Sequence, residues 1–132
     1  MDDMGRWTVD GTSEPGILRL KLEGTRTVQD LRAFVEAHNR AIDTFDGQDY
    51  KVWCEIATMD PLSAEASMVF EEGKCYSGAH RNFRGSAVLV ASNTTALQHR
   101  HSSIRSRVMD TEFIGSDVNL LREHLRTVYR SS

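Results

Sequence analysis

Histidines and serines are the residues of this sequence best suited to metal binding or nucleophilic catalysis, and their spacing favours neither. His99 and His101 are two residues apart on an expected helix, so their side chains point to different sides. No HExxH motif and no pair of histidines at helical i, i+4 spacing occurs. Ser92, Ser102 and Ser103 stand in no GxSxG context. We therefore expect no metal site and no catalytic serine.

The cysteines, glycines and paired carboxylates give no sign of redox, cofactor or acid–base chemistry. Cys54 and Cys75 form no CxxC motif, and free thiols are the simplest interpretation. The glycines match neither GxGxxG nor a phosphate-binding loop. Glu71 and Glu72 are adjacent on an expected helix, where their side chains diverge and cannot flank one substrate bond. The sequence therefore predicts no cofactor and lacks the nucleophile, base and orienting group that would indicate an enzyme.

Positive charge is concentrated in one stretch of the chain. Between Gly73 and Met109 there is no acidic residue, although the whole sequence carries 16 Lys and Arg against 19 Asp and Glu. Such a stretch indicates either a face for an anionic partner or a solvated face whose arginines pair with acidic groups of the same domain. The candidate anion-binding residues are Arg81, Arg84, Arg100, Arg105 and Arg107. A pI near 5.9 and the lack of an aromatic-rich RNA motif argue against a nucleic-acid partner.

Length and composition predict a single domain. The chain has 132 residues, of which 39% are hydrophobic and 27% charged, enough to bury a core without disulfides or metal. No apolar run reaches the roughly 18 residues of a membrane helix, and the acidic start Met1–Gly5 is unlike a signal peptide. We expect residues 1–5 to be a flexible N-terminus, residues 6–130 to form the domain, and the protein to be cytoplasmic.

Hydrophobic periodicity and capping residues predict an initial strand pair followed by alternating strands and helices. Thr27 is a suitable N-cap for the first helix, and Asp60 followed by Pro61 is a suitable start for the second. Ser116 is the expected cap of the last helix. The expected strands are residues 6–9, 17–22, 51–57, 85–91 and 111–114, and the expected helices are residues 28–45, 61–78, 96–108 and 117–128.

This order of elements predicts an α/β fold with a mixed, mostly parallel sheet of four to five strands. Arg19 and Lys21 alternate with leucines in the second strand, which indicates helices packed on only one face of the sheet. In the third strand, the side chain of Trp53 points to the face opposite that of Val52 and Cys54, so it would lie on the face without helices. There it would take part in a contact between two copies or pack under a loop or terminus. The inward side of the third helix is expected to comprise Leu97, His101, Ile104 and Val108.

With this order and these sizes, the chain resembles the SpoIIAA-like branch of the STAS family from about Trp7 to Tyr129. The resemblance implies a four- or five-stranded sheet with helices packed on one side, and a role as an anti-sigma-factor antagonist or related regulator rather than an enzyme. The segments that carry it are Gly16-Ile17-Leu18 to Glu23-Gly24, Thr27, Val52 to Met59 leading into Asp60, Ala87 to Ser92, and Ala96-Leu97-Gln98.

The resemblance places the functional point in the loop after the third strand, where antagonists have Asp, then Ser or Thr, then Gly. Asp60 matches the aspartate, but Leu62 occupies the usual phosphoacceptor position and Ser63 stands where glycine is expected. Ser63 has two interpretations. It is a modification site, since phosphate near a helix N-terminus meets free N–H groups and a favourable dipole, or a first-turn serine bonded to the local backbone.

Two hypotheses about the function follow, one of protein binding and one of small-ligand or lipid binding. The leading one is a non-enzymatic regulatory or protein-interaction module whose partner binds the loop Met59–Ser63 and the helix that follows. The alternative is a small-ligand or lipid-binding module, similar to the Sec14 architecture, in which Arg100, Arg105 and Arg107 meet an anionic head group.

Overall fold

The computed structural model describes residues 6–106 and 108–129. None of the helices in this part of the chain is long and apolar enough to cross a membrane. The elements in chain order are β1 (Trp7–Asp10), β2 (Ile17–Leu22), α1 (Val28–Thr44), β3 (Tyr50–Glu55), α2 (Ala64–Gly78), β4 (Phe83–Leu89), α3 (Asn93–Ser106), the short 3-10 helix η1 (Met109–Thr111), β5 (Glu112–Gly115) and α4 (Val118–Thr127).

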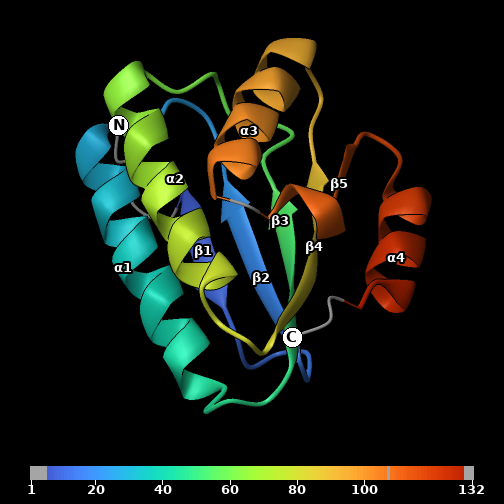
Figure 1. The fold of residues 1–132 in the computed structure, drawn as a ribbon. Coiled ribbons are helices and arrows are strands. Elements are labelled where there is room, and N and C mark those ends of the chain that lie inside the picture. Colours follow the sequence, from blue (N-terminus) through green and yellow to red (C-terminus); the bar gives the residue numbers. More distant parts are fainter. Residues whose placement is uncertain (1–5, 107, 130–132) are drawn as a thin grey trace.

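The strands form one mixed sheet in the order β1-β2-β3-β4-β5 (Figure 1). β1 and β2 pair antiparallel, whereas every later pairing is parallel. In the parallel part, Leu20 lies opposite Cys54, and Cys54 lies opposite Val88. The structure therefore confirms the predicted α/β fold with a mostly parallel sheet.

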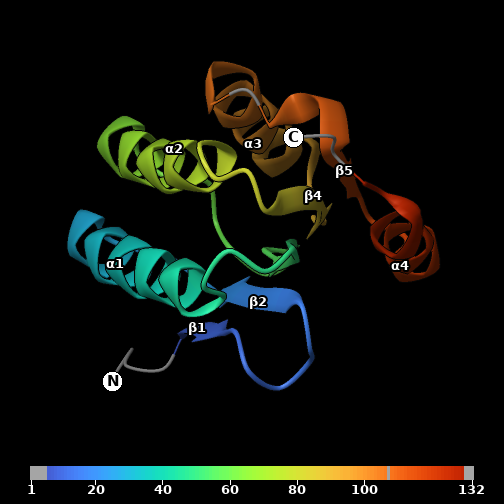
Figure 2. The same cartoon turned by 60° about the horizontal axis from the view of Figure 1, so that its bottom comes forward.

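α1, α2 and α3 lie over the same face of the sheet (Figures 1 and 2). The leucines of β2 alternate as the sequence predicts, and Leu18, Leu20 and Leu22 are buried beneath these helices. Thr27 caps α1 as expected, because its hydroxyl accepts a hydrogen bond from Asp30 N and the Asp30 carboxylate accepts one from Thr27 N.

α4 lies on the opposite face of the sheet, which corrects the expectation that helices cover one face only (Figure 2). Leu121 and Leu125 of α4 pack against Trp53 and Ala87, whose side chains point away from the main core. The polar pattern of β2 did not predict this helix because α4 packs against β3, β4 and β5. Trp53 is 5% exposed and is covered within the same chain, by this last helix and not by the expected loop or terminus.

α4 begins one residue later than expected, with Asp117 and not Ser116 as its cap. The Asp117 carboxylate accepts hydrogen bonds from Asn119 N and Leu120 N. A carboxylate satisfies two backbone donors and also carries charge toward the positive end of the helix dipole, so it is the stronger cap.

α3 presents to solvent the side that the sequence assigned to the core. Leu97 and Ile104 are 62% and 54% exposed, whereas His99 and Ser103 are buried. Of the residues predicted to face inward, Val108 is buried but lies beyond the helix, and His101 is exposed. The hydrophobic pattern predicts the wrong side because His99 and Ser103, on the other side of this helix, bind polar partners within the core.

The two adjacent leucines of α4 give a direct test of its packing. Replacing buried Leu121 with alanine should lower the free energy of unfolding by about 2–5 kcal/mol, because it leaves a cavity against Trp53 and Ala87. Replacing Leu120, which is 54% exposed, should change it by no more than about 0.5 kcal/mol. Urea unfolding of the two variants measures the difference, and equal effects would contradict the placement of α4.

Candidate functional site

The loop after β3 is held against the connection between β2 and α1. Gly24 N donates to Thr58 O (2.9 Å), and Asp60 N donates to Gly24 O (3.0 Å). The Thr25 hydroxyl donates to Asp60 Oδ2 (2.6 Å), so the carboxylate of Asp60 is engaged across the loop. Asp60 therefore fixes the shape of the loop.

Ser63, and not Asp60, is the N-cap of α2. The helix begins at Ala64, and Ser63 Oγ accepts a hydrogen bond from Ala66 N (3.1 Å). The prediction that Asp60 and Pro61 start the helix is wrong because the Asp60 side chain is bound to Thr25 instead. The local backbone bond of Ser63 matches one of its two interpretations, and modification of its exposed side chain stays a prediction.

Gln98 connects this loop to α3. Leu62 N donates to Gln98 Oε1 (2.9 Å), and Gln98 Nε2 donates to Leu62 O (2.7 Å). One side-chain amide thus satisfies both backbone groups of Leu62. The position of the loop next to Ser63 consequently depends on the position of α3.

The arginines of the basic stretch lie in two separate places. Arg81 and Arg84 are at the amino end of β4, where Arg84 pairs with Asp49 (3.0 Å) and its guanidinium lies over the Tyr129 ring. Arg100 and Arg105 are on α3, which follows the carboxyl end of that strand. Arg105 pairs with Glu71 of α2 (3.3 Å). The remaining candidate, Arg107, lies outside the described residues.

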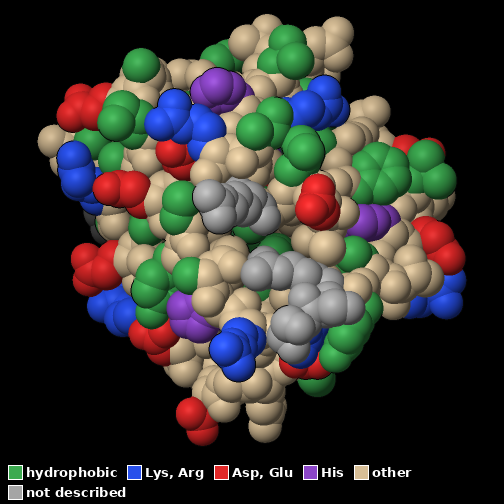
Figure 3. Space-filling model, viewed as in Figure 1, with side chains coloured by type: hydrophobic (Ala, Val, Ile, Leu, Met, Phe, Trp, Pro, Cys, Tyr) green, Lys and Arg blue, Asp and Glu red, His purple; other side chains and the backbone are tan. Residues whose placement is uncertain are grey.

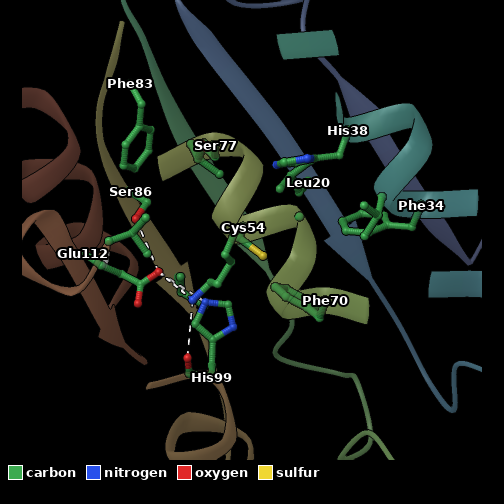
Figure 4. Close-up of a pocket in the computed structure, with 16 residues that line it drawn as sticks. Leu20, Phe34, His38, Cys54, Phe70, Ser77, Phe83, Ser86, His99 and Glu112 are labelled. Carbon is green, nitrogen blue, oxygen red and sulfur yellow. Dashed lines mark hydrogen bonds and ion pairs between the residues drawn. The ribbon is translucent and has the colours of Figure 1, made fainter. Parts of the chain in front are cut away.

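Four polar side chains meet between α2, α3 and β5, and we call them the Lys74 cluster: Lys74, His99, Ser103 and Glu112. Figure 4 shows two of them, His99 and Glu112, beside each other. Lys74 Nζ lies 3.0 Å from Glu112 Oε2, and His99 Nε2 lies 3.3 Å from the same oxygen. Lys74 also donates to Ser103 Oγ, which in turn donates to Glu112 Oε1. The Glu112 side chain is only 3% exposed, so this ion pair is inside the protein.

The electrostatics of the cluster follow from its burial. Burial alone raises the pKa of Glu112, but His99, Lys74 and Ser103 together outweigh that effect and lower it from 4.5 to about 2. Burial lowers the pKa of Lys74, and the neighbouring Glu112 opposes this shift. Burial likewise lowers the pKa of His99, which favours a neutral ring that donates to Glu112 through Nε2.

This arrangement does not activate Ser103 as a nucleophile. The amine of Lys74 donates to the carboxylate of Glu112, so it has no free lone pair with which to accept the serine proton. A carboxylate with a pKa of about 2 is a weak base, and Ser103 is 0% exposed. The cluster instead fixes α3, because two of its four side chains belong to that helix.

Next to the cluster, a cavity of about 40 Å³ lies among α1, α2, α3 and the sheet (Figure 4). Most of its wall is apolar, with Phe34 and Phe70 among the larger side chains, whereas His38, Lys74 and Glu112 contribute polar groups. Cys54 also lines it, and burial raises the pKa of its thiol to about 12, so the thiol is unreactive. The prediction that both cysteines are free is confirmed.

The Lys74 cluster was missed by the sequence analysis, although it left a signal. His99 and Ser103 are four residues apart and therefore lie on one side of α3. Thr95, four residues earlier, is buried on the same side. Within the described residues, no group of three or more His, Cys, Asp or Glu side chains is arranged to hold a metal ion.

We predict that Glu112→Gln lowers the free energy of unfolding at neutral pH by about 3–5 kcal/mol, because it leaves Lys74 buried without its counter-charge. Glu36→Gln is the matched control, since Glu36 forms an exposed pair with Arg40 and should matter little. The double variant Lys74→Met/Glu112→Leu should recover most of the loss. Urea unfolding measures all three.

The same carboxylate predicts a pH dependence. A pKa of about 2 in the folded state and 4.5 in the unfolded chain means that the unfolded chain binds more protons between these values. The contribution of Glu112 is therefore complete above pH 4.5 and is lost as the pH falls toward 2. Wild type should lose more stability than Glu112→Gln between pH 6 and pH 3, and parallel pH profiles would contradict the assignment.

Comparison with known proteins identifies the fold. No protein-family model matches the sequence, and no curated protein matches it. Among solved structures, the chain is similar to an uncharacterised protein of the DUF3478 family from Shewanella loihica PV-4, described as having a SpoIIAA-like fold. The match has a TM-score of 0.66 and 14% sequence identity, and covers 90% of this chain and 91% of the other. The chain therefore has a SpoIIAA-like α/β fold.

Proposed function

We propose that the chain is a non-enzymatic regulatory module, related in role to anti-sigma-factor antagonists, that binds a protein partner. The partner surface comprises the loop Met59–Ser63, the first turns of α2 and the outer side of α3. The observation that carries the proposal is the orientation of α3, which exposes Leu97 and Ile104 to more than half of their area.

Exposed aliphatic side chains at this density favour a contact surface. Leu97 and Ile104 are seven residues apart, about two turns, and therefore lie on one side of α3. Met68 of α2, 69% exposed, lies one turn after the Ser63 cap. Hydrophobic side chains reach the surface over this face of the molecule, between charged ones (Figure 3). Apolar groups rimmed by polar ones are typical of protein-binding surfaces.

The charges of α3 define the chemistry of the partner. The helix contains no acidic residue, and Arg100 and His101 are exposed beside the aliphatic side chains. Arg105 is already paired with Glu71. This pattern fits a protein partner with an apolar patch bordered by carboxylates. The alternative, a lipid or small anion bound by one basic face, is less favoured because Arg84 and Arg105 are engaged by Asp49 and Glu71.

Ser63 lies at the edge of this surface and would act as its switch. Its hydroxyl is at the N-terminus of α2, where an added phosphate meets free N–H groups and the positive end of the dipole. A phosphate would place a charge of about −1.5 to −2 beside the contact area. An acidic partner would then be repelled.

The test is affinity capture from lysate of the native host, with retained proteins identified by mass spectrometry and rebound in purified form. Leu97→Ser/Ile104→Ser should weaken partner binding at least about tenfold, because both side chains are removed from the contact. Ser63→Glu should weaken it as well, whereas Ser63→Asn keeps a cap without charge and should bind normally.

Leu120→Ser is the matched surface control, because Leu120 on α4 is 54% exposed, as is Ile104 on α3. A protein that binds the α3 double variant as tightly as wild type would overturn the proposed surface. If Leu120→Ser weakens binding as much as the α3 double variant does, the protein binds exposed hydrophobic side chains in general, and the proposed surface is also overturned.

A further inference from the structure

The cavity beside the Lys74 cluster has the features of a ligand site that are absent from an ordinary packing defect. Its wall contains a buried ion pair and two buried histidines, His38 and His99, alongside aromatic and aliphatic side chains (Figure 4). Packing defects in protein interiors are apolar as a rule, because polar groups in them are costly. An enclosed apolar space with a few convergent polar groups is the usual form of a small-molecule site.

The charge of the wall excludes an ionic ligand. Lys74 and Glu112 neutralise each other at 3.0 Å, and burial lowers the pKa of both His38 and His99, which favours their neutral forms. A ligand carboxylate or ammonium would therefore enter a buried space without a spare counter-charge. The cost of desolvating such an ion is several kcal/mol.

His38 supplies the polar contact. Its Nδ1 lies 2.8 Å from Asn39 Oδ1, an acceptor, so Nδ1 carries the proton and Nε2 has the free lone pair. No partner for Nε2 is found among the described residues. Figure 4 shows the His38 ring reaching from α1 toward α2 among the residues that line the cavity. A ligand hydroxyl or N–H would satisfy this acceptor.

The size of the cavity limits the ligand to a few heavy atoms. A volume of about 40 Å³ accommodates roughly three water-sized positions, each needing about 10–15 Å³. Gly73 sets part of this limit, since a Cβ at this position would approach Val35 Cγ2 to 3.2 Å. The helices α1 and α2 are thus in close contact where Gly73 and Val35 line the cavity, which leaves no room for a larger ligand at that point.

From these four observations we infer that the cavity binds a small uncharged molecule with an aliphatic body and one hydrogen-bond donor, of the alcohol class, with its hydroxyl on His38 Nε2. The site is separate from the partner surface on α3, so either can fail without the other. A short-chain alcohol fits the volume, the apolar wall, the mutual neutralisation of Lys74 and Glu112, and the acceptor that His38 provides.

Three probes of equal size separate these requirements: 2-propanol, acetone and acetate. In NMR titrations of the full chain, 2-propanol should give saturable shifts at residues lining the cavity, with a dissociation constant on the order of millimolar. Acetone lacks the donor and should bind about three- to tenfold more weakly, since one hydrogen bond is lost. Acetate should give no saturable shift, because its charge has no partner in the wall.

Variants locate the binding. Val52→Ile and Val88→Ile, each made singly, add a methyl group at the cavity wall and should abolish saturation by 2-propanol. Val90→Ile is the matched control, because Val90 is buried but does not line the cavity. His38→Leu should bind 2-propanol and acetone equally. Urea unfolding of each variant establishes that it is folded.

Three results would overturn the inference. Shifts that rise linearly with 2-propanol would mean that the cavity holds water only. Saturation that survives in both filled variants would place binding elsewhere. Acetate binding as tightly as 2-propanol would refute the exclusion of charge.

Discussion

The arrangement of α2, α3 and β5 depends on the ion pair between Lys74 and Glu112. Placing two charges inside a small domain is unfavourable unless each is fully hydrogen-bonded. Here Lys74 has Glu112, Ser103 and the His99 carbonyl around its amine. Glu112 in turn accepts from His99 and Ser103. The pair is therefore tolerated only while α2, α3 and β5 keep this arrangement.

The rotation of α3 about its axis is the direct consequence. His99 and Ser103 must face inward to complete the bonds of Glu112, and Leu97 and Ile104 must then face outward. A rotation that buried the two aliphatic residues would withdraw both polar groups from the ion pair. Glu112 would then keep Lys74 but lose the hydrogen bonds from His99 and Ser103, and a buried charge is tolerated only when its remaining lone pairs are hydrogen-bonded. The polar contacts decide the orientation for this reason.

α3 also links the cluster to the loop at Ser63. Gln98 clamps Leu62 on one side of the helix, while the next residue, His99, contacts Glu112 on another. Consecutive residues of a helix point about 100° apart, so one turn of α3 serves both the interior and the loop. Any shift of α3 along its axis therefore also moves Gln98, whose side chain holds the loop at Leu62.

The fold was predictable from the sequence where the local pattern and the tertiary contacts agree. The alternating leucines of β2 and the N-cap at Thr27 are local sequence signals, and the structure confirms both predictions. The sequence-based predictions are wrong where a residue far away in the sequence binds a side chain that would otherwise act locally. Asp60 is a better helix cap than most residues, but its carboxylate is taken by Thr25, 35 residues away.

The orientation of α3 is the larger error and has the same origin. A hydrophobic stripe predicts the buried side of a helix when the core is apolar, but this core contains an ion pair that selects the polar side. The solved structure to which this chain is similar shares only 14% identity with it. A fold maintained at such low identity is specified by strand alternation and helix packing, which many sequences satisfy. A shared fold does not give the function, so the function of this chain has to be argued from the surfaces that the polar contacts around Glu112 expose.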